Sequence, residues 1–195
     1  MIGSENKIKK KYQIVYIDPP WKYRNSDCIA KTSCISDKHH DHYQGMNLKE
    51  LCELPIKDIM DKDCLIFMWA TCANLNEAFI LAEAWGLKFG TVAFVWNKER
   101  VNPGYYTMSQ IELCLVFKYG RIPQPRGARN IRQYLSEKRT KHSKKPDDIR
   151  NRIELMFPYQ NKIEIFAREI HNGWDCLGND IDGKDIRESL QELIS

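Results

Sequence analysis

The stretch Gln-Ile-Val-Tyr-Ile-Asp-Pro-Pro-Trp, residues 13–21, decides the fold of this chain. An apolar run of strand length, 14–17, is followed at once by a carboxylate, two prolines and an indole. Open α/β sheets place their chemistry at the carboxyl ends of strands. The stretch therefore predicts a buried strand in an α/β sheet, with a functional site directly after Ile17.

The tetrapeptide after this strand suits a flat ring that carries an amine. Asp18 supplies an acceptor and Trp21 a stacking face. Because prolines fix φ and lack the backbone donor, we expect the Pro19 and Pro20 carbonyls to stay free for a ligand. An aromatic amine delocalises its lone pair, and acceptors that grip both N–H bonds make the nitrogen nucleophilic enough to be methylated. The alternative is a tight turn with a core tryptophan.

Length and composition indicate one soluble domain. The chain has 195 residues, of which 43% are hydrophobic, so we expect a single domain over 1–195, with 1–11 flexible. No apolar stretch is long enough to span a membrane, and the amino terminus lacks the apolar core of a signal peptide. These features predict a cytoplasmic protein.

Cysteine and histidine spacing predict neither a disulfide framework nor a metal site. The seven cysteines are odd in number and contain no CxxC pair. The cluster His39-His40-Asp41-His42 cannot aim all its side chains at one ion, and no second half is spaced to help. We therefore expect no metal, and interpret the cluster as part of a polar lid over 22–45.

The net charge of +4 is concentrated in one segment. Between Lys118 and Lys145 the chain has ten basic residues against one acid, Glu137. This segment, with Arg126, Arg129 and Lys141 as candidate contacts, is expected to hold nucleic-acid phosphates. The alternative is a solvated charged loop that has no partner.

Apolar periodicity predicts alternating strands and helices. The expected strands are 13–17, 64–69, 87–96, 111–118 and 162–166, and 101–110 is expected to be a loop. The expected helices are 47–60 with an Asn47/Glu50 capping box and a break at Pro55, 74–85 with a stop at Gly86, 146–156, and 185–194. This alternation predicts an α/β sheet, mostly parallel, with helices on both faces.

These landmarks, in this order, resemble one known family. The motifs are DPPW at 18–21, HYQGM at 42–46, LIFMWAT at 65–71, KKPDDIRNRIELMFP at 144–158 and KIEIFAR at 162–168. Together they are similar to the MT-A-seventy-like family of adenine methyltransferases, which includes bacterial and phage DNA enzymes and the catalytic subunit of the eukaryotic messenger-RNA adenosine methyltransferase. The resemblance covers residues 12–180.

The resemblance implies a Rossmann-like methyltransferase fold that uses S-adenosylmethionine, in a permuted order with the DPPW motif before the cofactor strand. It implies that Asp18 and the Pro19 carbonyl grip the target amine, with Pro20 and Trp21 completing the motif. Glu164 is similar to an acid that accepts from the cofactor ribose, and Lys145 to a lysine near its carboxylate. The remaining implied cofactor residues are Arg168, His171, Asn172, Asn179 and Asp180. The chain departs from the family pattern at Met108 and Asp180.

The expected reaction is methyl transfer to the exocyclic amine of adenine in DNA, after the base is extruded from the duplex. Tyr43 and Trp69 are candidates to sandwich that base, with a core role as the alternative for Trp69. Three other functions stay open. The first is an RNA adenosine methyltransferase and the second a non-catalytic nucleic-acid-binding subunit. The third is a cytosine amino methyltransferase, against which Asp18 argues, because those enzymes resemble this chain with Ser in place of that Asp. We expect a homodimer or a related partner subunit to assist recognition.

Overall fold

The computed structural model describes residues 10–22, 45–104, 106–139 and 144–195. Its framework is a seven-stranded sheet in the order β5-β3-β4-β2-β1-β6-β7. The strands are β1 Tyr12–Ile17, β2 Met60–Thr71, β3 Lys88–Asn102, β4 Ser109–Tyr119, β5 Tyr134–Ser136, β6 Lys162–Ile165 and β7 Asp175–Leu177. The strand that carries the tetrapeptide thus lies inside the sheet, between β2 and β6.

The sheet is mostly parallel, as predicted. β1 pairs in parallel with β2 and β6, β6 with β7, and β3 with β5. Among the described strands, β4 runs antiparallel to both its neighbours, β2 and β3. This mixed α/β sheet confirms the predicted Rossmann-like fold class, and the strand with the DPPW motif precedes β6 in the chain.

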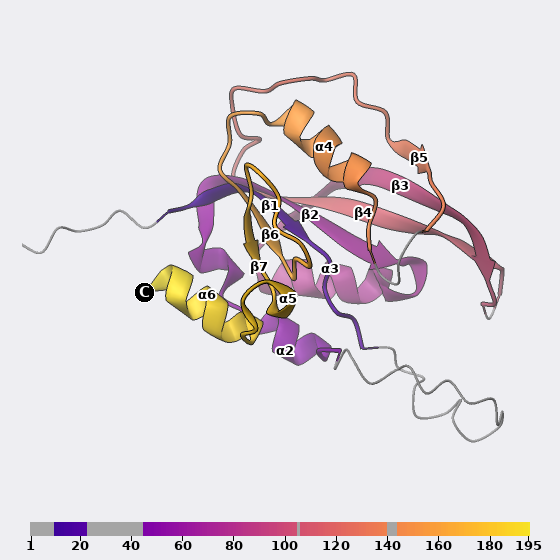
Figure 1. Cartoon of the computed structure of the whole chain (residues 1–195), viewed down its shortest axis with the longest axis horizontal. Helices are drawn as coiled ribbons and strands as arrows, with labels where there is room; N and C mark the ends of the chain where they lie inside the picture. Colours follow the sequence, from indigo (N-terminus) through magenta and orange to yellow (C-terminus); the bar gives the residue numbers. More distant parts are fainter. Residues whose placement is uncertain (1–9, 23–44, 105, 140–143) are drawn as a thin grey trace, which may run out of the picture.

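Helices cover both faces of the sheet, which also confirms the prediction (Figure 1). The helices are α2 Leu48–Cys52, α3 Leu75–Ala84, α4 Asp147–Met156, α5 Asn179–Asp182 and α6 Ile186–Ile194. Because strand side chains alternate, Val15 and Ile17 pack with α2, α3 and α6, whereas Ile14 and Tyr16 pack with α4. The site after β1 is therefore anchored by two hydrophobic cores, one on each face.

Local sequence signals place the helix ends close to where they are observed. The Asn47 side chain accepts from the Glu50 amide and the Glu50 side chain returns the bond, so the predicted capping box is present. The short 3-10 turn Ile56–Asp58 follows Pro55. Gly86 has a positive φ of 72° after α3, and Pro146 caps α4 from just outside the helix.

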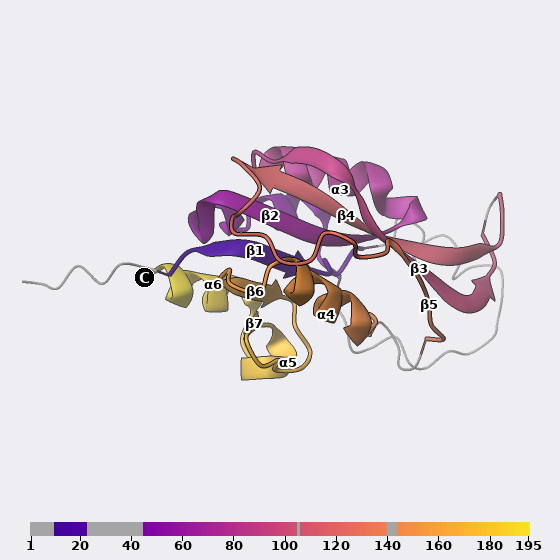
Figure 2. The ribbon, with the colours of Figure 1, turned by 90° about the horizontal axis from the view of Figure 1, so that it is seen from above.

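The predicted bounds of the loop 101–110 are wrong, because β3 extends to Asn102 and β4 begins at Ser109. β3 and β4 continue past their apolar segments and form a long hairpin that projects beyond the rest of the sheet (Figure 2). Ladder hydrogen bonds sustain these extensions although their side chains are polar, with Asn102 pairing Ser109 near the tip. The same cause explains why β2 begins at Met60, inside the predicted helix 47–60.

Some expected features lie outside the described residues. These are the flexible segment 1–9, most of the lid 22–45 with its histidine cluster and Tyr43, and Lys141. Lys10 of the expected flexible terminus is described, and its Nζ lies 2.5 Å from an Asp175 carboxylate oxygen. Within the described ranges no helix is both long and apolar enough to cross a bilayer.

A tight turn after β4 gives the first testable prediction. Gly120 has a φ of 67°, and a Cβ there would lie 2.0 Å from the Lys62 carbonyl oxygen. Gly120→Ala should therefore lower the free energy of unfolding by about 3 kcal/mol, the sum of left-handed strain and a backbone clash. Gly86→Ala, where φ is 72° and a Cβ would meet nothing within 4 Å, should cost about 1 kcal/mol. Urea denaturation measures both variants, and equal losses would contradict the packing argument.

Candidate active site

A cavity opens where the carboxyl ends of β1 and β6 lie side by side. It is open to solvent, and the empty space within its rim, open solvent included, is about 550 Å³. Its lining residues come from β1 and the residue after it, from the segment before α4, from α4, and from β6 and the segment after it. They are Tyr16, Asp18, Lys144, Lys145, Arg150, Glu164, Phe166, Arg168, Glu169 and His171. Five predicted site residues, Asp18, Lys145, Glu164, Arg168 and His171, are thus brought together.

An ion pair joins Asp18, the predicted acceptor for the target amine, to Lys145, a predicted cofactor residue. Lys145 Nζ donates to Asp18 Oδ2 at 2.7 Å and lies 3.3 Å from Glu112 Oε2. Burial raises the pKa of the Asp18 carboxyl, and Lys145 opposes that rise. Burial lowers the pKa of the Lys145 ammonium, but Asp18 and Glu112 more than offset this, so it stays protonated. The carboxyl group at the cavity wall, that of Asp18, therefore has a raised pKa and a fixed position.

The prediction that both proline carbonyls remain free of protein partners is wrong. The Trp21 amide donates to the Pro19 carbonyl at 2.8 Å, and the Met46 amide donates to the Pro20 carbonyl at 2.9 Å. Proline removes its own donor, but it does not keep other donors away from its oxygen. A carbonyl oxygen has two lone pairs, so Pro19 retains the capacity to accept a second hydrogen bond.

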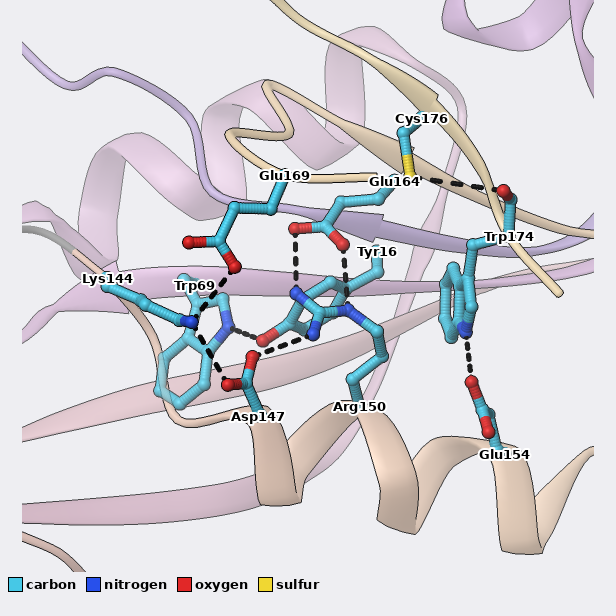
Figure 3. Close-up of polar contacts among 10 residues, drawn as sticks. All are labelled: Tyr16, Trp69, Lys144, Asp147, Arg150, Glu154, Glu164, Glu169, Trp174 and Cys176. Atoms are coloured by element: carbon cyan, nitrogen blue, oxygen red, sulfur yellow. Dashed lines mark hydrogen bonds and ion pairs between the residues drawn. The ribbon is translucent and has the colours of Figure 1, made fainter. Parts of the chain in front are cut away.

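A buried arginine fixes a second carboxylate of the cavity lining (Figure 3). Arg150 of α4 donates to both carboxylate oxygens of Glu164, at 2.8 and 3.2 Å, and to Asp147 at 3.0 Å. Burial lowers the pKa of the Arg150 guanidinium, but Glu164, Tyr16 and Asp147 together more than offset this, so the pKa is raised. The guanidinium also lies 5.7 Å from the Tyr16 ring centroid. Glu164 is therefore a fixed carboxylate at the cavity rather than a loose strand end.

Lys144 forms a second polar bridge over the same region. Its Nζ lies 3.0 Å from Asp147 Oδ2 and 3.0 Å from Glu169 Oε2. Figure 3 shows this ammonium between the two carboxylates, which come from the start of α4 and from the segment after β6. The bridge ties together two segments that both line the cavity.

The backbone after β6 turns sharply at the cavity. Phe166 has a φ of 62°, which is uncommon for a residue other than glycine, and its side chain lines the cavity. The Ala167 amide donates to the Leu177 carbonyl at 2.8 Å, and a Cβ on Gly178 would lie 2.2 Å from the Ala167 carbonyl oxygen. Gly178 is therefore required for this close approach between the ends of β6 and β7.

Three predicted cofactor residues do not line the cavity. Asn172, Asn179 and Asp180 are exposed, and they follow β6 and β7 at the same edge of the sheet. Their assignment rests on the resemblance alone.

Trp69 lies in the core, which is the role predicted as the alternative to stacking on the target base. It is 1% exposed, and its Nε1 donates to the Tyr16 hydroxyl at 2.7 Å. The Trp21 Nε1 donates to the Trp69 carbonyl at 3.2 Å. The described conformation therefore gives Trp69 no open face on which an extruded base could stack, although Lys145 Nζ lies 5.6 Å from its ring centroid.

The basic segment is divided between two places. The Arg126 guanidinium stacks 4.8 Å above the Phe157 ring centroid, and the Gly127 and Ala128 amides donate to the last carbonyls of α4. Arg126 thus lies at the opposite end of α4 from Lys145 and does not line the cavity, and its expected phosphate contact stays a prediction. Arg129 is exposed beside it.

Sequence reasoning missed the partners of the charged residues. Arg150, on a helix with alternating charges, carried no signal of burial. Lys98 lies just beyond the predicted strand 87–96, and Glu112 near the start of the predicted strand 111–118. Their opposite signs on strands that could pair were the available clue, because Glu112 pairs with Trp96 and so lies diagonally from Lys98.

The sequence comparison supplies the remaining observation. A family model described as MT-A70 matches residues 12–180. The chain belongs to the MT-A70 family. It is 43% identical, over 95% of its own length and 84% of the relative, to the Type II methyltransferase M.MunI of a Mycoplasma species. The expectation of an adenine methyltransferase enzyme is thereby confirmed.

Eukaryotic members are more distant and much longer. The chain is 28% identical to an N(6)-adenosine-methyltransferase MT-A70-like protein of Arabidopsis thaliana and 27% identical to the human N(6)-adenosine-methyltransferase catalytic subunit METTL3. These alignments cover 92% and 90% of the chain but 25% and 29% of the two relatives. The chain therefore corresponds to one part of those proteins.

Proposed function

We propose that this MT-A70 family member transfers a methyl group from S-adenosylmethionine to the exocyclic amine of adenine at specific sites in DNA. The observation that carries the proposal is the Asp18 carboxylate at the wall of the cavity, held at 2.7 Å by Lys145. A fixed carboxylate acceptor is what an aromatic amine requires before its nitrogen can attack a methyl group.

The cavity has the chemistry to hold the methyl donor. That molecule carries a carboxylate, an ammonium group, a ribose diol and an adenine ring. Lys144, Lys145 and Arg168 offer cationic groups in the lining, and Glu164 and Glu169 offer carboxylates. Phe166 and Tyr16 supply aromatic surface. When bound, the donor supplies an electrophilic methyl group on a positively charged sulfur.

The proposed role of the chain is to orient the target amine and to stabilise its developing positive charge. Asp18 accepts one N–H of the amine and the Pro19 carbonyl accepts the other. The amine lone pair forms the new N–C bond while the C–S bond breaks and its electron pair stays on sulfur. The methylated nitrogen then passes one proton to the Asp18 carboxylate, which later releases it to water. Lys145 keeps the carboxylate in place and ionised until that proton transfer.

Similarity favours DNA over RNA as the substrate. The identity of 43% to a bacterial Type II methyltransferase exceeds the 28% and 27% to eukaryotic adenosine methyltransferases. The exposed cations Arg129, Arg132 and Lys138 lie along the segment that leads back to the cavity, where they would hold phosphates. The formation of a homodimer, or of a complex with a related subunit, stays a prediction. Sedimentation in the presence of DNA tests it by measuring the mass of the complex.

The direct test is transfer of labelled methyl groups to duplex DNA, single-stranded DNA and RNA of matched sequence. We expect label on adenine of duplex DNA, with a reaction that weakens as salt rises because phosphate contacts release counterions. Label on RNA alone would move the function to the RNA alternative. Cofactor binding without label on any polymer would instead indicate a non-catalytic subunit, and the catalytic proposal would fail for this chain.

A further inference from the structure

Four ionised side chains form a line of alternating charge that begins at the cavity wall. Asp18 binds Lys145 at 2.7 Å, Lys145 lies 3.3 Å from Glu112 Oε2, and Lys98 Nζ donates to Glu112 Oε1 at 3.2 Å. Each of the two carboxylate oxygens of Glu112 therefore serves a different lysine. The charges of the line sum to zero.

Because Lys98 is buried and Glu112 is partly buried, the loss of either charge would leave the other poorly compensated. The side chains of Lys98 and Glu112 are 7% and 14% exposed, so neither charge is well solvated. A buried carboxylate must be compensated by nearby cations or it becomes costly. Lys98 lies on β3 where the projecting hairpin leaves the sheet, a position that would suggest a phosphate contact. Its burial and its ion pair argue against that role.

Loss of the Lys98 charge would redistribute the remaining three. Glu112 would keep Lys145 as its one cation in the line, and the ammonium would be drawn from Asp18 toward Glu112. The net charge of the group would fall from zero to −1. Both changes disfavour the ionised form of Asp18, which the methyl-transfer geometry requires.

We propose that Lys98 is a positioning residue for methyl transfer, which acts through Glu112 to hold Lys145 against Asp18. This rests on the proposed function, because it assigns Asp18 as the acceptor for the target amine. Lys98 itself touches neither substrate nor cofactor in this assignment.

Two further titratable or charged groups interact with Asp18 besides Lys145 and Glu112. They are the Arg168 guanidinium from the segment after β6 and the Cys114 thiol of β4, and none of the substitutions proposed below changes either of them. Burial raises the pKa of the Cys114 thiol well above its usual range, so it stays neutral. A shift in the Asp18 titration can then be assigned to the line of four.

The test compares Lys98→Met, Lys98→Arg and the double variant Lys98→Met/Glu112→Gln, with Lys88→Met as control. Lys88 is an exposed lysine on the same strand. The readouts are the pH profile of methyl transfer and the free energy of unfolding. Lys98→Met should move the acid limb of the profile upward by about one pH unit, so the rate below the limb falls about tenfold. Lys98→Arg, the double variant and Lys88→Met should keep the wild-type limb.

The double variant separates positioning from simple structural support. If Lys98 acts through Glu112, removal of both charges restores neutrality, and the two stability losses are not additive. Additive losses with an unshifted acid limb in Lys98→Met would overturn the proposal. If Lys98→Met fails to fold, a wild-type acid limb in the double variant supports the proposal and a displaced limb refutes it. If the wild type transfers no methyl group, the proposed function fails, while the stability cycle still decides whether the two residues are coupled.

Discussion

Asp18→Asn should reduce the rate of methyl transfer by about 10²–10³-fold, the typical cost of losing one electrostatic group at a reacting centre. The amide keeps the shape of the side chain and one acceptor, but it cannot carry the negative charge that holds Lys145 at 2.7 Å. Measurement of label transfer to duplex DNA, with cofactor affinity by calorimetry on the same sample, separates loss of chemistry from loss of binding. A variant with wild-type rates would remove Asp18 from the mechanism.

The pH dependence of the wild type provides a second readout of the same residue. Burial raises the pKa of the Asp18 carboxyl above that of an ordinary aspartate. Because the reaction requires the ionised form, the rate should rise as pH increases through this raised pKa, and the acid limb should lie at higher pH than an ordinary aspartate would give. Asp18→Asn should abolish the limb. An unchanged limb in the variant would show that another group controls it.

Arg150→Met should lower the free energy of unfolding by about 3–5 kcal/mol, the range found when one partner of a buried ion pair is removed. Glu164 is 9% exposed and both of its oxygens accept from Arg150, so the variant strands a buried carboxylate. The folded variant should bind a proton there, which makes it relatively more stable at low pH than at neutral pH. Urea denaturation across this pH range measures both effects.

Two further variants test the cause of that loss. Arg187→Met, in which an arginine with 49% of its side chain exposed loses its contact with Glu50, should cost less than about 1 kcal/mol. Arg150→Met/Glu164→Leu should recover part of the stability because no carboxylate remains unpaired. Equal losses in Arg150→Met and Arg187→Met would mean that the buried pair contributes no more than a surface contact.

Sequence predicts the fold well where a local signal decides the structure. The Asn47/Glu50 capping box, the stop at Gly86 and the apolar face of 146–156 each involve residues within one or two helical turns. The apolar run after Gln13 also identifies the central strand. In these segments local preference and tertiary packing agree, so a pattern in the chain is sufficient.

The polar parts of the site were harder to predict because partners distant in the chain decide them. Arg150 becomes a wall of the cavity only because Glu164 of β6 lies beside α4. The Pro19 and Pro20 carbonyls lose their expected freedom to amides on Trp21 and Met46. Lys98 lies on the part of β3 beyond the predicted strand 87–96, and the burial of its charge depends on an ion pair with Glu112 of another strand, which no local pattern reveals.

The position of β1 beside β6 in the sheet also determines at what stage of synthesis the active site can form. β1 is made well before β6, yet Ile17 pairs with Ile165 of β6, and Lys145 of the cavity follows Asp18 by 127 positions. Until β6 emerges, β1 lacks its partner on that side, and long-range pairing of this kind slows folding. A nascent chain therefore cannot modify nucleic acid before the segment through β6 has been made.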